Sequence, residues 1–443
     1  MKNKPFVTIL TLWLASTSIH AEDPSSSDKN NIILLPIKQE NLSNDYIKNA
    51  KINLKNGHYR KAHKLIINAI EIDKKIYGYT HQQTATDFSL LAHTLFLQDH
   101  HTRAKAFFLK SQEIRKKLFP KNDIILTDNL FGLALIEKAQ AKYNVALSKQ
   151  KSILKKRNNS NTNNNVDIAR SLLEIANLEI TLANFSKAEL NISRAEEITT
   201  KNIGSDHPLN ILLLRQKSLL ETEKGNFSIA DKHDKIILEK QIKSLGRNNV
   251  LVAATLSNIA NRMINNKKSA LALPLLRESQ TIYHTEFGPQ SLKFATNLSH
   301  IASANLKLGA YVKAKEMNNR SSSITKKILI NNKHPLIAIN LINQAKYLAA
   351  KKKYNESNQS FLDAQIIFET VYGSQHPKVA QLIAERADIL MKQKQFSKAK
   401  THYLKAINIL KSYFKENNPL LLTVSEKYKN FIDNEPQLEE VIM

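Results

Sequence analysis

Small side chains recur along the chain at a spacing of 42 residues, with one slip of a single residue. The positions in this series are Ala62, Ala104, Ala146, Ala188, Ala230, Ala272, Ala314, Ser357 and Ala399. An aromatic residue stands three positions before most of them, and His101 and Ser269 are the exceptions. A pattern that returns at a fixed period over most of a chain predicts an array of one repeated structural unit.

A second series of small residues lies twelve positions before the first. Its members are Ala50, Ala92, Ala134, Ala176, Ser218, Ala260, Ala302, Ala345 and Ala387. A large apolar residue stands four positions before each, as Leu256 does before Ala260. Large and small side chains at i and i+4 share one face of a helix and allow a second helix to approach closely. Each unit is therefore predicted to begin with a helix that packs tightly against its neighbours.

A longer second helix is predicted after a tight loop. In the first unit Tyr59, Ala62, Ile66 and Ala69 form an apolar stripe with helical spacing. Gly57, Gly225 and Gly309 stand at the loops inside units, two residues before the aromatic. Helix-breaking stretches such as "IGSDHP" (203–208) and "YGSQHP" (372–377) follow the second helices. Glycine favours the end of a helix and proline the first turn of the next, so these stretches predict junctions between units.

These features resemble tetratricopeptide repeats: a Gly-x-aromatic before the loop alanine, the small residue twelve positions earlier, and junctions that end in His-Pro. The period of 42 residues and the stretch "SALALPLLRESQTIY" (269–283) resemble the kinesin-light-chain-like branch of that family. The resemblance implies an all-α fold, an α-solenoid in which about nine helical hairpins stack into a right-handed superhelix. It also implies that the concave surface binds a peptide or protein partner.

The two ends of the array are expected to differ from its middle. The array is predicted over 41–418, and 419–443 should form a capping helix and tail, because Lys429 stands where the other units have a small residue. Residues 22–40 are predicted to be a linker and an N-terminal edge segment. Within them the apolar run "IILLPI" (32–37) is expected to cover the exposed side of the first hairpin.

Residues 1–21 have the pattern of a secretory signal peptide. A basic start, the apolar stretch "PFVTILTLWLAS" and a small residue at Ala21 predict cleavage after Ala21 and a periplasmic or secreted protein. An uncleaved membrane anchor is the alternative, although Thr8 and Thr11 interrupt the apolar run. No transmembrane helix is expected after cleavage. The sequence has no cysteine, so an exported protein would lack disulfides and a lipid-bearing cysteine.

Composition agrees with an all-helical chain and adds a strong positive charge. There are only 9 glycines and 11 prolines in 443 residues, and the formal net charge is +26. The excess of lysine and arginine is spread over most units and is frequent in second helices, as in "SKQKSILKKR" (148–157). A solvated outer surface explains such scattered charge. The alternative is a cationic binder of an anionic envelope polymer or nucleic acid.

Catalytic and metal-binding patterns are not found in the sequence. There is no cysteine nucleophile, Gly-x-Ser-x-Gly, phosphate-binding loop or HExxH motif. The junction histidines His81, His207, His334 and His376 are separated by whole units, so they would lie in a row instead of converging on one ion. We expect them to cap helices. No enzymatic activity, cofactor or metal site is predicted.

The inner face of the superhelix is the predicted partner-binding groove. Residues one position after, and two or three before, the small residue of each first helix are expected to point into it. The candidate groove residues are Asn177, Arg215, Gln216, Asn258, Asn261, His300, Asn343 and Lys346. Rows of amides and charges suit hydrogen bonding to a peptide backbone. The alternative is a merely hydrated concave surface. The sequence thus predicts an exported scaffold or adaptor.

Overall fold

Helices make up the chain, in the order that the repeat predicts. The computed structural model describes residues 34–440, with gaps at 122, 161–163, 203, 205–206 and 330–331. The helices in the described part are α2 (Leu34–Lys55), α3 (Tyr59–Ile76), α4 (Gln82–Leu97), α5 (His101–Leu118), α6 (Leu126–Ala139), α7 (Tyr143–Asn158), α8 (Asn165–Thr181), α9 (Phe185–Asn202), α10 (Leu209–Glu223), α11 (Phe227–Leu245), α12 (Val250–Asn265), α13 (Ser269–Phe287), α14 (Leu292–Lys307), α15 (Tyr311–Ile328), α16 (Pro335–Ala350), α17 (Tyr354–Tyr372), α18 (Pro377–Lys392), α19 (Phe396–Lys411) and α20 (Pro419–Glu440). The prediction of an all-α solenoid is confirmed.

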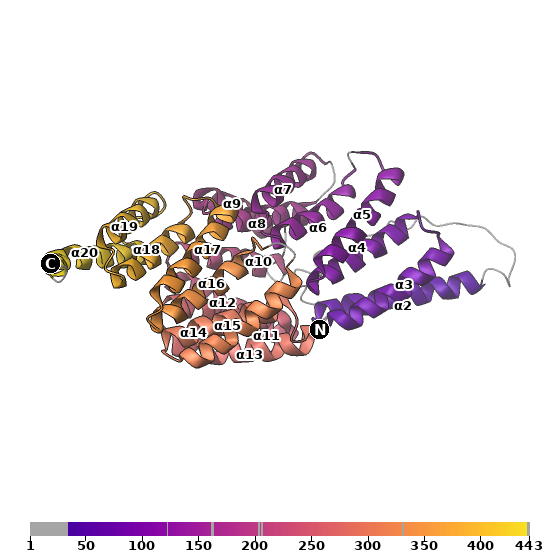
Figure 1. Cartoon of the computed structure of the whole chain (residues 1–443). Coiled ribbons are helices and arrows are strands. Elements are labelled where there is room, and N and C mark those ends of the chain that lie inside the picture. The colour runs from indigo at the N-terminus through magenta and orange to yellow at the C-terminus, as the bar shows by residue number, and fades with distance from the viewer. Residues whose placement is uncertain are drawn as a thin grey trace.

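Each repeat unit is a hairpin of two antiparallel helices. We number the hairpins as units 1 to 9, from α2/α3 to α18/α19, and α20 follows as an unpaired first helix. Figure 1 shows the hairpins following one another along a coil, with α20 far from α2 and α3. Every member of the two series of small residues is buried, with at most 4% of its surface exposed. The close helix–helix approach that these residues predict is therefore present in all units.

A residue with positive φ ends the first helix of every unit. These residues are Gly57, Asp99, Ala141, Ala183, Gly225, Lys267, Gly309, Lys352 and Lys394. Only three are glycine, and the others have φ between 59° and 63°. A left-handed conformation costs a non-glycine residue roughly 1 kcal/mol, so the loop geometry is kept even where the sequence does not favour it.

The junctions between units end one helix and begin the next. Gly246, Gly288 and Gly373 follow α11, α13 and α17 with φ of 79°, 78° and 93°, which favours glycine. Four junction histidines accept a hydrogen bond from the backbone N–H two residues later, through Nδ1 of His81, His207, His334 and His376. Asn249 and Asn418 cap their helices in the same way with side-chain oxygens, and Ser291 Oγ accepts from the N–H three residues later. The prediction that the junction histidines cap helices is confirmed.

Successive turns of the superhelix touch each other, and the contacts repeat from unit to unit. The loop of one unit meets the N-terminus of the first helix five units later. Asp99 Oδ2 accepts from Leu292 N at 3.1 Å, and Lys224 O accepts from Asn418 Nδ2 at 2.8 Å; these pairs are 193 and 194 residues apart. Where His376 carries its hydrogen on Nε2, that nitrogen donates to Thr181 O at 3.1 Å, 195 residues away.

Aromatic rings close the space beside these contacts. The ring at the start of a second helix packs on the ring at the end of the second helix five units later. The pairs are Tyr59–Phe287, Tyr143–Tyr372 and Phe185–Phe414, with centroids 5.6, 5.7 and 5.9 Å apart. The aromatic residues of the repeat therefore also join one superhelical turn to the next.

The N-terminal boundary differs from the prediction. Leu34–Ile37 form the first turn of α2 instead of a separate segment across the first hairpin, and Ile37 is 47% exposed. Proline is tolerated in a first turn, since no N–H is needed there, so Pro36 starts the helix and does not interrupt it. The predicted signal peptide and its cleavage site lie outside the described residues. Within those residues, no helix combines the length and apolar character needed to cross a membrane.

Candidate functional site

The first helices form the inner side of the superhelix. Neighbouring first helices, such as α8 and α10 or α14 and α16, contact each other more closely than neighbouring second helices do. The second helices carry most of the large apolar side chains that are exposed, including Leu190, Leu271 and Val312. Among the described residues, the first helices of units 2–9 carry none of these. The inner face is therefore polar where it meets solvent, and the outer face is mixed.

Several predicted groove residues bind each other across neighbouring first helices. The residue after one small residue pairs with the residue two positions before the next. Asn177 Nδ2 donates to Gln216 Oε1 at 3.0 Å, Ser303 Oγ donates to Asn343 Oδ1 at 2.9 Å, and Lys346 Nζ donates to Glu385 Oε1 at 2.8 Å. Lys427 and Asp388 continue the row at 2.6 Å. We call this series the inner row; its polar groups mostly satisfy one another.

Two of these residues are not available in the groove as predicted. Asn343 is 1% exposed, and its Nδ2 also donates to Ser299 O at 3.0 Å. Gln216 is 2% exposed. Their amides are used between helices because close approach of the first helices covers them. The expectation that Asn343 and Gln216 point into an open groove is wrong.

The inner row is interrupted at α12, in the middle of the array. In unit 5 Leu219 stands where units 4, 7 and 8 have Asn177, Ser303 and Lys346, and Asn258, the residue that would pair with it, is exposed. Unit 3 also has a leucine there, Leu135, but its counterpart Glu174 is paired with Lys138. Asn261 is partly buried and does not pair with His300, its counterpart in the next unit. His300 Nδ1 lies 3.4 Å from Ser257 Oγ, and burial lowers the pKa of His300 to about 4, so its imidazole is neutral at pH 7.

Arg215 lies on α10 beside this interruption. Its guanidinium is partly buried, and burial lowers its pKa, while Asp234 opposes that shift. Asp234 already pairs with Arg262 at 2.6 Å and accepts from Ser218 Oγ at 2.8 Å. Within the described part of the chain, no carboxylate lies at ion-pair distance from Arg215. With its amide in the orientation that satisfies its neighbours, Gln241 accepts from Arg215 Nη2 through its side-chain oxygen at 3.3 Å. Asn258 and Asn261 keep unused hydrogen-bonding capacity, and we call these two residues, with Arg215 and His300 on the neighbouring first helices, the α10–α14 patch.

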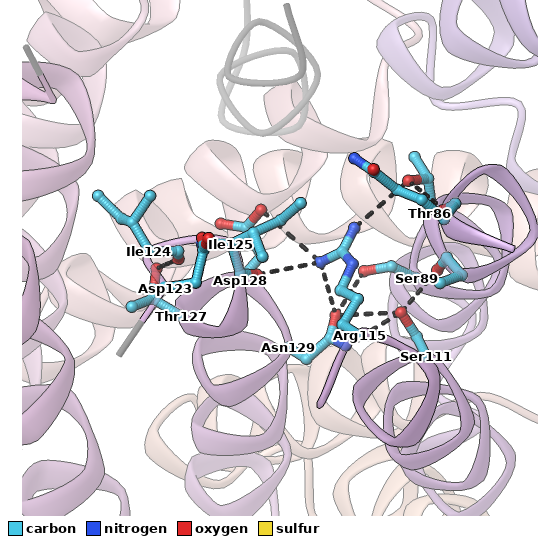
Figure 2. Close-up of polar contacts among 12 residues, drawn as sticks. Thr86, Ser89, Ser111, Arg115, Asp123, Ile124, Ile125, Thr127, Asp128 and Asn129 are labelled. Carbon is cyan, nitrogen blue, oxygen red and sulfur yellow. Dashed lines mark hydrogen bonds and ion pairs between the residues drawn. The ribbon is translucent and has the colours of Figure 1, made fainter. Parts of the chain in front are cut away.

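A buried arginine network in units 2–4 was not predicted. Arg115 is 1% exposed and donates to Asn129 Oδ1 at 3.3 Å and to Ile125 O at 3.2 Å. Figure 2 shows its guanidinium between Thr86 of α4 and the start of α6. Arg157 lies at the equivalent position one unit later and donates to Ser171 Oγ at 2.8 Å.

The network has a sequence signal. Both arginines stand eleven residues after the loop alanine, on the buried face of the second helix. They join helices of neighbouring units, and Asp128 lies between them at 3.9 Å from Arg115 and 3.6 Å from Arg157. A buried ion pair of this kind adds little net stability, because the cost of removing the charges from water offsets much of their attraction.

The histidines do not converge on a metal. No group of three or more His, Asp or Glu side chains in the described residues is arranged to hold an ion. His93 and His376 are buried, and their pKa values are lowered to about 3, chiefly by burial. Neutral capping and packing account for these histidines.

Comparisons with known proteins identify the fold. No family model and no curated protein sequence matches the chain. A Rap protein crystallised with competence and sporulation factor is similar in structure, with a TM-score of 0.60 and 15% identity over 84% of this chain and 99% of that chain. Aspartyl phosphate phosphatase F from Bacillus subtilis (TM-score 0.47, 14% identity, 88% and 96% covered) and a putative kinesin light chain repeat protein from Podosopora anserina (TM-score 0.36, 17% identity, 45% and 94% covered) are more distant. In its fold the chain is a tetratricopeptide-like repeat protein.

Proposed function

We propose that this protein is a scaffold or adaptor that binds a peptide or protein segment on its inner face, at the α10–α14 patch. The observation that carries this proposal is the interruption of the inner row. Between units 4 and 5, 7 and 8, and 8 and 9, the corresponding polar groups bind each other, whereas Asn258 and Asn261 have no polar partner among the described residues. Exposed amides that are held on a rigid helix suit the backbone of an extended peptide.

Arg215 indicates that the bound peptide or protein segment carries a negative charge. A guanidinium without a carboxylate partner favours a ligand that brings one, either an acidic side chain or a chain terminus. The Rap protein of similar fold, crystallised with competence and sporulation factor, supports binding as the role of such a solenoid. We further propose that the protein acts by binding and not by catalysis, because the sequence has no recognisable catalytic set.

A binding experiment with matched variants tests the proposal. Peptides selected from a random display library against the wild-type protein serve as probes. Replacing Asn258 and Asn261 together with alanine should weaken their binding about tenfold, since each hydrogen bond contributes roughly 0.5–1.5 kcal/mol. Asn319→Ala is the control, because Asn319 is exposed on the second helix α15. Equal affinity for all three proteins would contradict the proposal.

The positive charge supports a rival function, as a binder of anionic polymers. Lys398 and Lys405 are exposed on α19, on the outer face. Replacing both with glutamine should leave peptide binding unchanged if the inner face is the site. Loss of binding in this variant alone, with retention by the asparagine variant, would favour the polymer hypothesis.

Export is a separate part of the proposal and is supported by the sequence alone. The pattern of residues 1–21 indicates a signal peptide, so the mature protein should begin at Glu22 in the periplasm or outside the cell. N-terminal sequencing of the protein purified from its native source tests this. An intact Met1 on protein extracted from membranes would indicate an anchor.

A further inference from the structure

A cavity lies between the two superhelical turns, away from the inner face. Its volume is about 450 Å³. The lining residues come from the loops of units 2 and 3 and from the junction between units 7 and 8, and they include His100, His101, Arg103, Lys142 and Leu329. Four units therefore build one cavity, and it exists only because the superhelix brings a first and a second turn together.

The cavity is present because one aromatic pair is missing from the repeat. At the equivalent place in other units, Tyr59 packs on Phe287 and Tyr143 on Tyr372. In unit 2 the position of Tyr59 is occupied by His101, and in unit 7 the position of Phe287 is occupied by Leu329. A smaller ring facing an aliphatic side chain leaves space that two large rings fill elsewhere.

The polar lining is predominantly cationic or hydrogen-bond donating. Arg103 and Lys142 are exposed at the cavity, and His100 and His101 lie beside them. Lys142 also forms an ion pair with Glu137 at 3.4 Å, so Arg103 is the cation of the lining that lacks a carboxylate partner among the described residues. The one carboxylate in the lining, that of Asp99, is already engaged, because it accepts from Lys293 Nζ at 2.8 Å and from Leu292 N at 3.1 Å. Ile328 and Leu329 supply an apolar wall.

We infer that this cavity binds a small organic anion. Arg103 and Lys142 would hold a phosphate or carboxylate group, and the imidazoles of His100 and His101 would add hydrogen bonds. The apolar part of the ligand would lie against Ile328 and Leu329. A ligand there contacts both superhelical turns, so its binding would stabilise their contact. This site is independent of the α10–α14 patch.

Citrate and inorganic phosphate are the probes, measured separately by isothermal titration calorimetry at low ionic strength on the full chain. The inference expects one saturable site for at least one of them, and the preferred probe identifies the anionic group. Arg103→Gln should weaken binding about tenfold, because it removes a charged donor. Lys61→Gln is the matched control: Lys61 has the same repeat position in unit 1, where the aromatic pair is complete.

His101→Tyr is the second test, because it restores the large aromatic residue that most other units have at this position. The variant should fill the cavity and abolish binding, while its thermal unfolding shows that it is folded. Three results would each overturn the inference: no saturable binding of either probe to the wild type, an equal loss in Lys61→Gln and Arg103→Gln, or undiminished binding by folded His101→Tyr.

Discussion

Single residues show where the repeat pattern is informative and where it is not. The small residues of each unit are buried as their spacing predicts. The partner of a polar side chain is not encoded in the spacing, because Asn343 and Asn258 occupy the same repeat position and yet one is 1% exposed and the other is exposed to solvent. The difference depends on whether the preceding unit supplies Ser303 or Leu219, which requires the contact between helices to be known.

Asn343→Ala should therefore reduce stability, although Asn258→Ala should not. Removing the buried amide takes the acceptor from Ser303 Oγ and one donor from Ser299 O and Oγ, which costs about 1–3 kcal/mol. Chemical denaturation of the two variants against wild type measures this difference. Equal midpoints for Asn343→Ala and Asn258→Ala would show that the inner row does not stabilise the array.

Gly132 lies within helix α6, away from the loops and junctions where the repeat places its other glycines, and its lack of a side chain is explained by packing against Phe108. A Cβ atom added there would lie 2.2 Å from Cζ of Phe108, which is fully buried. Gly132→Ala should destabilise the protein, because overpacking costs about 1–3 kcal/mol and outweighs the roughly 1 kcal/mol that alanine gains in helix propensity. Phe108→Leu in the same chain should recover part of the loss, and a thermal melt of the single and double variants measures it. A higher melting temperature for Gly132→Ala alone would contradict the packing explanation.

The helices and the junctions between them were predictable because helix periodicity and helix capping depend on residues that are close in sequence. Junction histidines cap first helices, and the same place is taken by Asn249, Ser291 and Asn418, so one geometry accepts three residue types. The left-handed loop residue was predictable only where it is glycine. At Lys267 or Ala183 the conformation is imposed by the packing of the hairpin, for which sequence propensity gives no signal.

The capping histidines predict a loss of stability in acid. The folded-state pKa of His376 is about 3, below the ordinary value near 6.5, because burial disfavours the imidazolium. The unfolded chain therefore binds the proton first, so this contribution to stability is present above about pH 6.5 and is lost as the pH falls towards 3. By pH 4.5 the loss from one such histidine is about 2–3 kcal/mol.

His376→Asn keeps a capping side chain that does not titrate. The variant should be less stable at pH 7, because its contact with Thr181 O is lost, but it should lose less stability than wild type between pH 7 and 4.5. Urea denaturation at the two pH values measures both effects. An identical pH dependence for the two proteins would show that His376 binds its proton equally well in the folded and unfolded states.

Loop glycines report the contact between superhelical turns. Gly225 and Gly309 have φ of 83° and 74°, but a Cβ at Gly225 would lie 2.7 Å from Cδ of Pro419, and at Gly309 it would meet nothing within 4 Å. Both alanine variants are destabilised because alanine disfavours a positive φ. Only Gly225→Ala also places a methyl group against Pro419 at the start of α20. We expect Gly225→Ala to be the less stable of the two in denaturation experiments. The opposite order would mean that the turns do not touch at this loop.

At the scale of the whole molecule, the solenoid was predictable and the contact between its turns was not. The period predicts that hairpins stack, but the rotation between neighbours determines whether unit 1 meets unit 6, and that rotation is set by side-chain packing. The sequence places the recurring aromatic residues at the loop of each hairpin. In the structure, three of them also pack on rings of the unit five positions later. The cavity beside His101 depends on the same contact between superhelical turns, so it could not be predicted from the sequence either.

Deleting residues 418–443 should weaken a region far away in sequence. Asn418 and Pro419 contact Lys224 and Gly225, so their removal exposes the loop between α10 and α11 as well as α19. Hydrogen exchange should show reduced protection at the facing ends of α10 and α11. Loss of protection confined to α18 and α19 would show that α20 stabilises only its neighbour in the chain.

The repeated contacts between superhelical turns also have a mechanical consequence. An open solenoid behaves like a soft spring, because small rotations between units add up to a change in pitch. Here a change in pitch must separate the loops of units 1–5 from the helix ends of the units five positions later. Hydrogen bonds and pairs of aromatic rings join these two turns of the superhelix at several places. Packed interfaces of this kind open as a whole and do not stretch gradually. Under a pulling force the molecule should therefore be stiff at small extensions, and the contacts between its superhelical turns should then break together at one threshold force.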